Sequence, residues 1–141
     1  MDENLKRAIL LDHYNNPHNK GLVDDDRYIE IHNVSDSCID DIKVQLLVEN
    51  DKISDIHFDG VGCTICYSST SIISDLIKGK TRDEAMNIIN NYYNMLDEKE
   101  YDPDLLEEAN AFETLYKQAN RIKCGTIGIH AMEDAIKKSY E

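Results

Sequence analysis

The middle of the chain alternates between apolar and polar residues, which is the pattern of strands with one buried face. Every second residue from Ile42 to Val48 is apolar, and the intervening Lys43 and Gln45 are polar. The letters ENDK then provide a turn, and ISDIHF at positions 53–58 repeats the alternation. These two segments predict an antiparallel hairpin.

The segments before and after this hairpin supply further elements. Residues 27–32 contain tyrosine and isoleucine, which favour a third strand beside the hairpin. Near the start, the apolar residues of ENLKRAILLDHY recur at helical spacing. This helix is expected to end at the letters NNP, because the residue before a proline avoids the helical region. Helical character returns after Gly62, and the apolar stripe of residues 68–77 is expected to end at Gly79.

The C-terminal half is predicted to be helical. Thr81 and Glu84 have the spacing of a capping box and open one helix. Others are expected at residues 105–116 and from about residue 127 to residue 138. Strands first and helices afterwards predict an α+β fold, with a small three-stranded antiparallel sheet and helices packed on one of its faces. No repeat or linker divides the sequence, so a single domain over residues 1–141 is expected.

The acidic composition narrows the range of functions. The chain has 141 residues and a formal net charge of -13, which would repel the phosphate backbone of a nucleic acid. No apolar run approaches the roughly 20 residues of a membrane span, and the N-terminus lacks the form of a secretory signal. We therefore expect a cytoplasmic protein that binds neither nucleic acid nor membrane. In that reducing compartment, its four cysteines are expected to be thiols or metal ligands rather than disulfides.

Three of the cysteines stand at the ends of predicted elements. Cys38 precedes the hairpin, Cys63 begins a helix and Cys124 precedes the last helix, so the fold could bring them together at one end of the sheet. Asp40 could add an oxygen ligand. Three thiolates and a carboxylate suit the four-coordinate preference of zinc, and thiolates also suit iron-sulfur clusters. The alternative is that each cysteine is a small buried apolar residue.

The letters GCTIC place Cys66 three positions after Cys63. A CxxC pair alone indicates neither a zinc ribbon, which needs a second pair, nor a thioredoxin-like motif, which needs a βαβ context. Cys63 is the better placed of the two to reach outward, because it begins the helix. A thiolate there is stabilised by the helix dipole and the first N–H groups.

Three stretches carry a family resemblance. They are LLDHYNNPHNKG near the start, SCIDDIKVQLLVENDKISDIHFDGVGCTICYSSTSIISDLIKGK in the middle and RIKCGTIGIHAMEDAIKK at the end. Together they resemble the U-type iron-sulfur cluster assembly proteins. The long stretch between Cys63 and Cys124, and Lys123 where a histidine would mark the IscU branch, are similar to the SufU branch.

The resemblance implies a metal site and a partner. It implies that Cys38, Asp40, Cys63 and Cys124 hold zinc, and that Arg121 in the RIKC motif contacts a partner protein. It also implies that the protein accepts sulfur from a pyridoxal-phosphate-dependent cysteine desulfurase. Downstream iron-sulfur assembly proteins would then receive that sulfur.

Two positions depart from the family pattern. Ile39 replaces the usual glycine between the first cysteine and the aspartate, and a β-branched residue forbids most of the backbone angles open to glycine. This restricts the movement expected of the Cys38 loop. Cys66 has no counterpart in the pattern, and we expect it to be a structural neighbour rather than a ligand.

These observations favour a zinc-bound, sulfurtransferase-like sulfur carrier with Cys38 as the acceptor, because its loop is the least constrained by a following helix. Whether this carrier acts as an enzyme stays open. Zinc would keep the thiolates inert until one leaves the metal to attack a persulfide. One alternative is a scaffold on which an iron-sulfur cluster is assembled on the same cysteines. Another is an interaction module whose zinc is purely structural.

Overall fold

The computed structural model describes residues 1–36 and 39–141. Its helices and strands are, in chain order, α1 (Glu3–Asn15), β1 (Ile29–Val34), β2 (Asp41–Glu49), β3 (Lys52–Val61), α2 (Thr64–Ile77), α3 (Arg82–Leu96) and α4 (Ala119–Lys138). Three short 3-10 stretches connect α3 to α4: η1 (Pro103–Leu105), η2 (Glu107–Phe112) and η3 (Leu115–Lys117). Within the described chain, no helix is long and apolar enough to cross a membrane.

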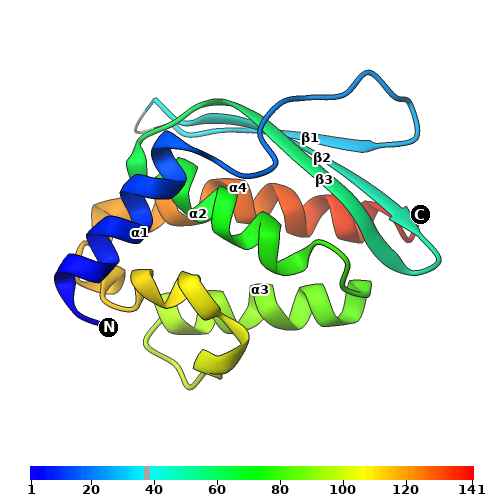
Figure 1. The fold of residues 1–141 in the computed structure, drawn as a ribbon. Helices are drawn as coiled ribbons and strands as arrows, with labels where there is room; N and C mark the ends of the chain where they lie inside the picture. Colours follow the sequence, from blue (N-terminus) through cyan, green and yellow to red (C-terminus); the bar gives the residue numbers. More distant parts are fainter. Residues whose placement is uncertain (37–38) are drawn as a thin grey trace.

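The three strands form one antiparallel sheet in the order β1-β2-β3, as the alternating pattern predicts. Val44 lies at its centre, opposite Ile31 of β1 and Phe58 of β3. Ile42 and Leu46 share the face of Val44 and are fully buried, because this face forms part of the core. Figure 1 shows the helices gathered on one side of the sheet. The predicted α+β fold with helices on one face is confirmed.

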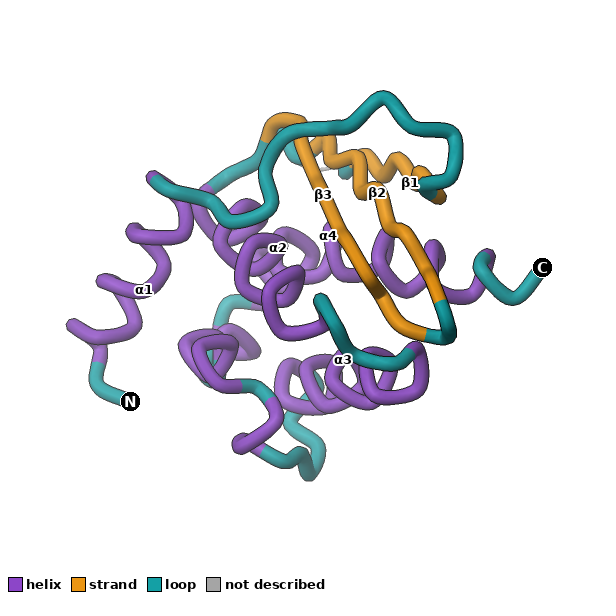
Figure 2. Tube along the Cα trace, turned by 45° about the vertical axis from the view of Figure 1, so that its right-hand side comes forward, coloured by secondary structure: helices purple, strands orange, loops and turns teal. Residues whose placement is uncertain are grey.

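Helix α4 joins the sheet to the other helices. It packs against β1 and β2 and also against α2, and Figure 2 shows it passing behind the strands beside α2. The contact between α2 and α4 is unusually close at one point. A Cβ atom on Gly128 would lie 2.1 Å from the side-chain oxygen of Thr70. Only glycine fits at this position of α4.

The start of α4 corrects a prediction. The helix begins earlier than expected, at Ala119, so Cys124 lies inside it and not before it. Gly125 lies in the stretch before residue 127 that was not expected to be helical, and Gly128 lies just after it. Glycine weakens a helix interior. The close approach of Thr70 to Gly128 shows why the structure keeps a glycine there. Tertiary packing outweighs local propensity in this helix.

The prediction of one continuous helix at residues 105–116 is also wrong. The segment forms the separate 3-10 stretches η1, η2 and η3. Glu107 has a φ of 43°, in the left-handed region that a continuous right-handed helix does not contain. This residue interrupts the segment near its start.

The loop between α1 and β1 pairs with the edge of β3. The Gly21 N–H donates to the Phe58 carbonyl at 2.8 Å, and the Phe58 N–H donates to the Asn19 carbonyl at 3.0 Å. Farther along, the Gln45 side chain accepts from the Val23 N–H and donates to the Val23 carbonyl. Because an unpaired strand edge invites association with other chains, this loop protects the sheet.

Gly128→Ala is expected to lower the free energy of unfolding by about 1–3 kcal/mol, because the new Cβ must push α2 away from α4. Asp134→Ala is the control, since Asp134 is an exposed residue of the same helix. Urea unfolding followed by circular dichroism measures both variants. Wild-type stability in Gly128→Ala would contradict the close packing against Thr70.

Candidate metal centre

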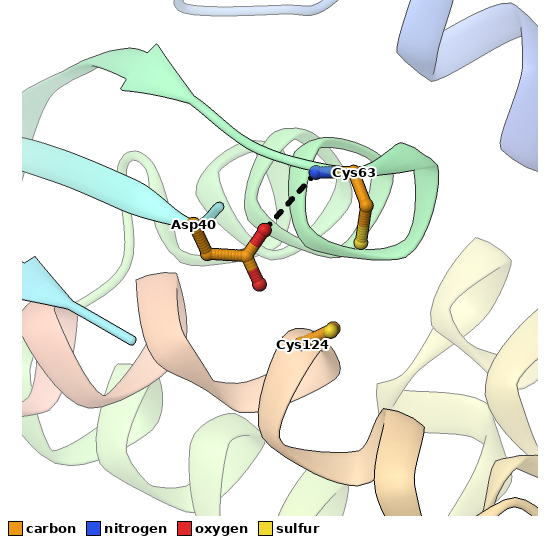
Figure 3. A group of neighbouring side chains, drawn as sticks. All are labelled: Asp40, Cys63 and Cys124. Atoms are coloured by element: carbon orange, nitrogen blue, oxygen red, sulfur yellow. Dashed lines mark hydrogen bonds between the residues drawn. The ribbon is translucent and has the colours of Figure 1, made fainter. Parts of the chain in front are cut away.

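The candidate site begins at the first residues of α2. Cys63 is the N-cap of this helix, and no capping hydrogen bond of its side chain is found in the described chain. Its sulfur points toward Cys124 of α4 (Figure 3). Gly62 precedes it, and a Cβ there would lie 2.8 Å from the sulfur of Cys66. As the N-cap, Cys63 lies at the positive end of the α2 dipole.

Asp40 lies directly before β2 and is tied to both neighbouring segments. Its backbone carbonyl accepts from the Ser35 N–H at 2.8 Å, which closes the turn between β1 and β2. Its side-chain Oδ1 accepts from the Cys63 N–H at 3.0 Å (Figure 3). One carboxylate thus connects the β1–β2 loop to the start of α2.

The surroundings of the second carboxylate oxygen of Asp40 favour the binding of a cation. The side chain is 0% exposed, and its Oδ2 has no hydrogen-bond partner among the residues that the structure describes. A buried carboxylate is costly unless it is paired, hydrogen-bonded or bound to a metal. The residues present therefore fit a positively charged ion beside Oδ2.

Cys124 is positioned by the packing of α4 against α3. The Tyr92 hydroxyl of α3 donates to the carbonyl of Gly125 at 2.7 Å, next to Cys124 in the chain. Burial raises the pKa of Tyr92, so this hydroxyl stays protonated at neutral pH and keeps donating. The bond fixes the turn of α4 that carries the Cys124 side chain, which is buried.

These three residues converge although they are far apart in the sequence. One ligand atom each from Asp40, Cys63 and Cys124 lies within 4.8 Å of the other two (Figure 3). No further histidine, cysteine or carboxylate of the described chain belongs to this group. Two sulfurs and one oxygen at this spacing can share one ion, and zinc binds both types of ligand. The cluster is consistent with a metal site.

A buried tyrosine holds the chain just before Cys63. The Tyr67 hydroxyl donates to the carbonyl of Gly60 at 2.6 Å. Burial, and to a smaller extent the negative charge of Asp59, raises the pKa of Tyr67 to about 12. The Tyr67 hydroxyl therefore stays protonated and remains a donor at neutral pH. This bond ties the end of β3 to α2, and so supports the turn between them.

An open hollow of about 520 Å³ lies over Cys63 and Cys124. Arg121 and Lys123 of α4 line it, and among the described residues no acidic side chain does. Ile39 lines it as well and is 67% exposed. The mouth of the site is therefore cationic and partly apolar, although the protein carries a net charge of -13. Such a mouth attracts anionic groups.

The structure brings together Asp40, Cys63 and Cys124 of the four predicted ligands, whereas Cys38 lies outside the described residues. Arg121 lies at the mouth. Tyr92 could not be predicted from the sequence, because its support of α4 depends on contact between distant helices and leaves no local signal.

Comparison with known proteins shows the family of the chain. The sequence model of the family described as the NifU-like N terminal domain matches residues 6–141. The chain belongs to this family. Family membership confirms the resemblance inferred from the three sequence stretches.

Two relatives align with nearly the whole chain. The first is the zinc-dependent sulfurtransferase SufU of Bacillus subtilis (strain 168), 33% identical over 137 residues, with 96% of this chain and 92% of the relative covered. The second is the iron-sulfur cluster assembly scaffold protein IscU of Streptococcus pyogenes serotype M1, 34% identical over 136 residues, with 96% and 84% covered. At such similar identities, these two relatives do not separate the SufU and IscU branches.

A solved structure of similar sequence shares the fold. It is the putative iron-sulfur cluster assembly scaffold protein for the SUF system from Fervidobacterium islandicum AW-1. It is 28% identical and superposes with a TM-score of 0.81, with 96% of this chain and 99% of that chain covered. The NifU-like fold therefore extends over nearly the whole chain.

Cys63→Ser and Cys124→Ser are each expected to lose most of the bound zinc, because each removes a sulfur from the group of three ligand atoms. Cys66→Ser is the matched control, since Cys66 is buried outside that group. Metal analysis of protein purified without chelator gives the zinc content per chain. Equal zinc loss from Cys66→Ser would place Cys66 among the ligands.

Proposed function

We propose that this protein works in iron-sulfur cluster assembly as a zinc-bound sulfur carrier. The family and the names of the two relatives, a zinc-dependent sulfurtransferase and a cluster assembly scaffold, support this proposal. The observation that carries it is the buried Asp40 oxygen without a partner in the described chain, close to the Cys63 and Cys124 sulfurs. This donor set suits a cation that binds both sulfur and oxygen.

Zinc is the metal proposed for the site. Asp40, Cys63 and Cys124 supply three ligands, and Cys38 is the proposed fourth. Cys38 lies outside the described residues, so its assignment rests on its position two residues before Asp40 and on the family resemblance. Zinc held by these residues would keep the cysteine sulfurs deprotonated and restrain their reactivity.

The surrounding residues prepare the site to receive sulfur. The N-terminus of α2 stabilises negative charge at Cys63. Arg121 and Lys123 at the mouth attract the anionic persulfide of a donor. In the transfer, the Cys38 thiolate attacks the outer persulfide sulfur, the donor's cysteine thiolate leaves, and Cys38 keeps the sulfur as a new persulfide.

The proposed donor is a pyridoxal-phosphate-dependent cysteine desulfurase, and the recipients are downstream iron-sulfur assembly proteins. Arg121 is the proposed contact for the desulfurase, because it is exposed at the mouth of the site. The long stretch between Cys63 and Cys124, and Lys123 before Cys124, support the SufU branch. The proposed compartment is the cytoplasm, where thiols stay reduced.

A scaffold for cluster assembly is the second candidate. The open hollow over Cys63 and Cys124 offers room for a group larger than one ion, and this observation favours it. Anaerobic incubation with iron, sulfide and a reductant separates the two functions. A stable visible chromophore would favour the scaffold, and retention of one tightly held zinc would favour the carrier.

Asp40→Ala is expected to reduce zinc affinity by at least the roughly tenfold that loss of an outer-shell partner costs, because a direct ligand is removed. Persulfide formation from cysteine and a desulfurase should fall with it. Asp41→Ala is the matched control, since Asp41 is the next residue and its exposed carboxylate bonds His32 instead. Zinc titration and mass analysis of the persulfide measure both effects.

Unchanged zinc affinity and persulfide yield in Asp40→Ala would place Asp40 outside the site. The lifetime of a reconstituted cluster gives a further reading. If the protein is a scaffold, removal of this oxygen ligand should slow cluster release, so a longer-lived cluster in Asp40→Ala would favour that alternative.

A further inference from the structure

The start of α2 carries a second cysteine that the metal group does not include. Cys63 is the N-cap and Cys66 is the third residue of the helix. Side chains at these two positions can each reach the backbone of the other residue, as α3 of the same protein shows. There the N-cap Thr81 and the third residue Glu84 exchange two hydrogen bonds between side chain and backbone. Helix α2 has cysteines where α3 has this pair.

The sulfur of Cys66 packs against Gly62, the residue before Cys63, and lies 2.8 Å from where a Cβ of Gly62 would be. Cys66 is 0% exposed, so a partner protein cannot reach it directly. The Cys63 sulfur instead faces Cys124 (Figure 3). Rotation about the Cα–Cβ bond of Cys63 would turn its sulfur from the metal group toward Cys66.

We propose that Cys66 is a resolving thiol that releases sulfur held on Cys63 as hydrogen sulfide. This inference rests on the proposed sulfur-carrier function. Sulfur reaches Cys63 when its thiolate attacks the outer sulfur of the Cys38 persulfide and the Cys38 thiolate leaves. The Cys66 sulfur then attacks the Cys63 sulfur and forms a disulfide with it. The bond from Cys63 to the outer sulfur breaks, and hydrogen sulfide leaves with the hydrogens of the persulfide and of the Cys66 thiol. The outer sulfur is reduced to sulfide, and the Cys66 sulfur is oxidised to the disulfide level.

This step gives the protein a local reductant for the sulfur that it carries. A cluster contains sulfide, whereas a persulfide sulfur must first be reduced to that level. Because Cys66 is separate from Asp40, Cys63 and Cys124, metal binding by those residues does not consume it. A dithiol reductant then returns the Cys63–Cys66 disulfide to two thiols.

The test compares wild type with Cys66→Ser after sulfur loading. Each protein is incubated anaerobically with a cysteine desulfurase and cysteine, then desalted to remove cysteine, with no other reductant present. Bound sulfur, released sulfide and the mass of the tryptic peptide 53–78 are measured over time. This peptide is diagnostic, because it lies between Lys52 and Lys78 and contains Cys63 and Cys66 as its two cysteines.

Wild type is expected to release sulfide while peptide 53–78 loses two hydrogens and resists alkylation. Cys66→Ser should take up the same sulfur and release it at least about tenfold more slowly. Equal release from both proteins, or a wild-type peptide that keeps both thiols while sulfide is lost, would overturn the inference and leave the carrier function standing. If neither protein takes up sulfur, the proposed function fails and the inference falls with it. If Cys66→Ser does not fold, the mass and alkylation of wild-type peptide 53–78 alone test the inference.

Discussion

A buried carboxylate must be compensated, and the arrangement of the candidate site follows from how Asp40 meets this requirement. The Cys63 N–H compensates one oxygen, and no partner in the described chain compensates the other. Because that N–H belongs to the N-cap of α2, the same bond places the start of the helix beside the β1–β2 loop. The remaining oxygen then lies with two sulfurs, and the three atoms together favour a cation.

The third member of the group depends on packing far from the carboxylate. Gly128 lets α4 lie against Thr70 of α2, and Tyr92 holds the turn of α4 next to Cys124. A metal at this point would join the β1–β2 loop, α2 and α4. Metal binding to the folded protein would therefore add to its folding stability. The reactive thiols and the stability of the fold would be coupled in this way.

Local patterns predicted much of this structure. The hairpin followed from strict alternation, and the capping box of Thr81 and Glu84 followed from two side chains three residues apart. Cys63 was found as a candidate ligand because it stands at the end of an element, and Asp40 was found because it lies two residues after Cys38. The start of α4 was placed too late, because Gly125 disfavours a helix locally and is accommodated by contacts with distant residues. The orphaned Asp40 oxygen likewise became visible only once burial and partners were known.

The central claim is that a buried carboxylate shares a metal with cysteine sulfurs. X-ray absorption at the zinc edge of the zinc-loaded protein tests it most directly, because it counts sulfur and oxygen neighbours by their distances. We expect three sulfurs at about 2.3 Å and one oxygen at about 2.0 Å from zinc. A shell of four sulfurs and no oxygen would contradict it, because Cys66 would then have taken the place of Asp40.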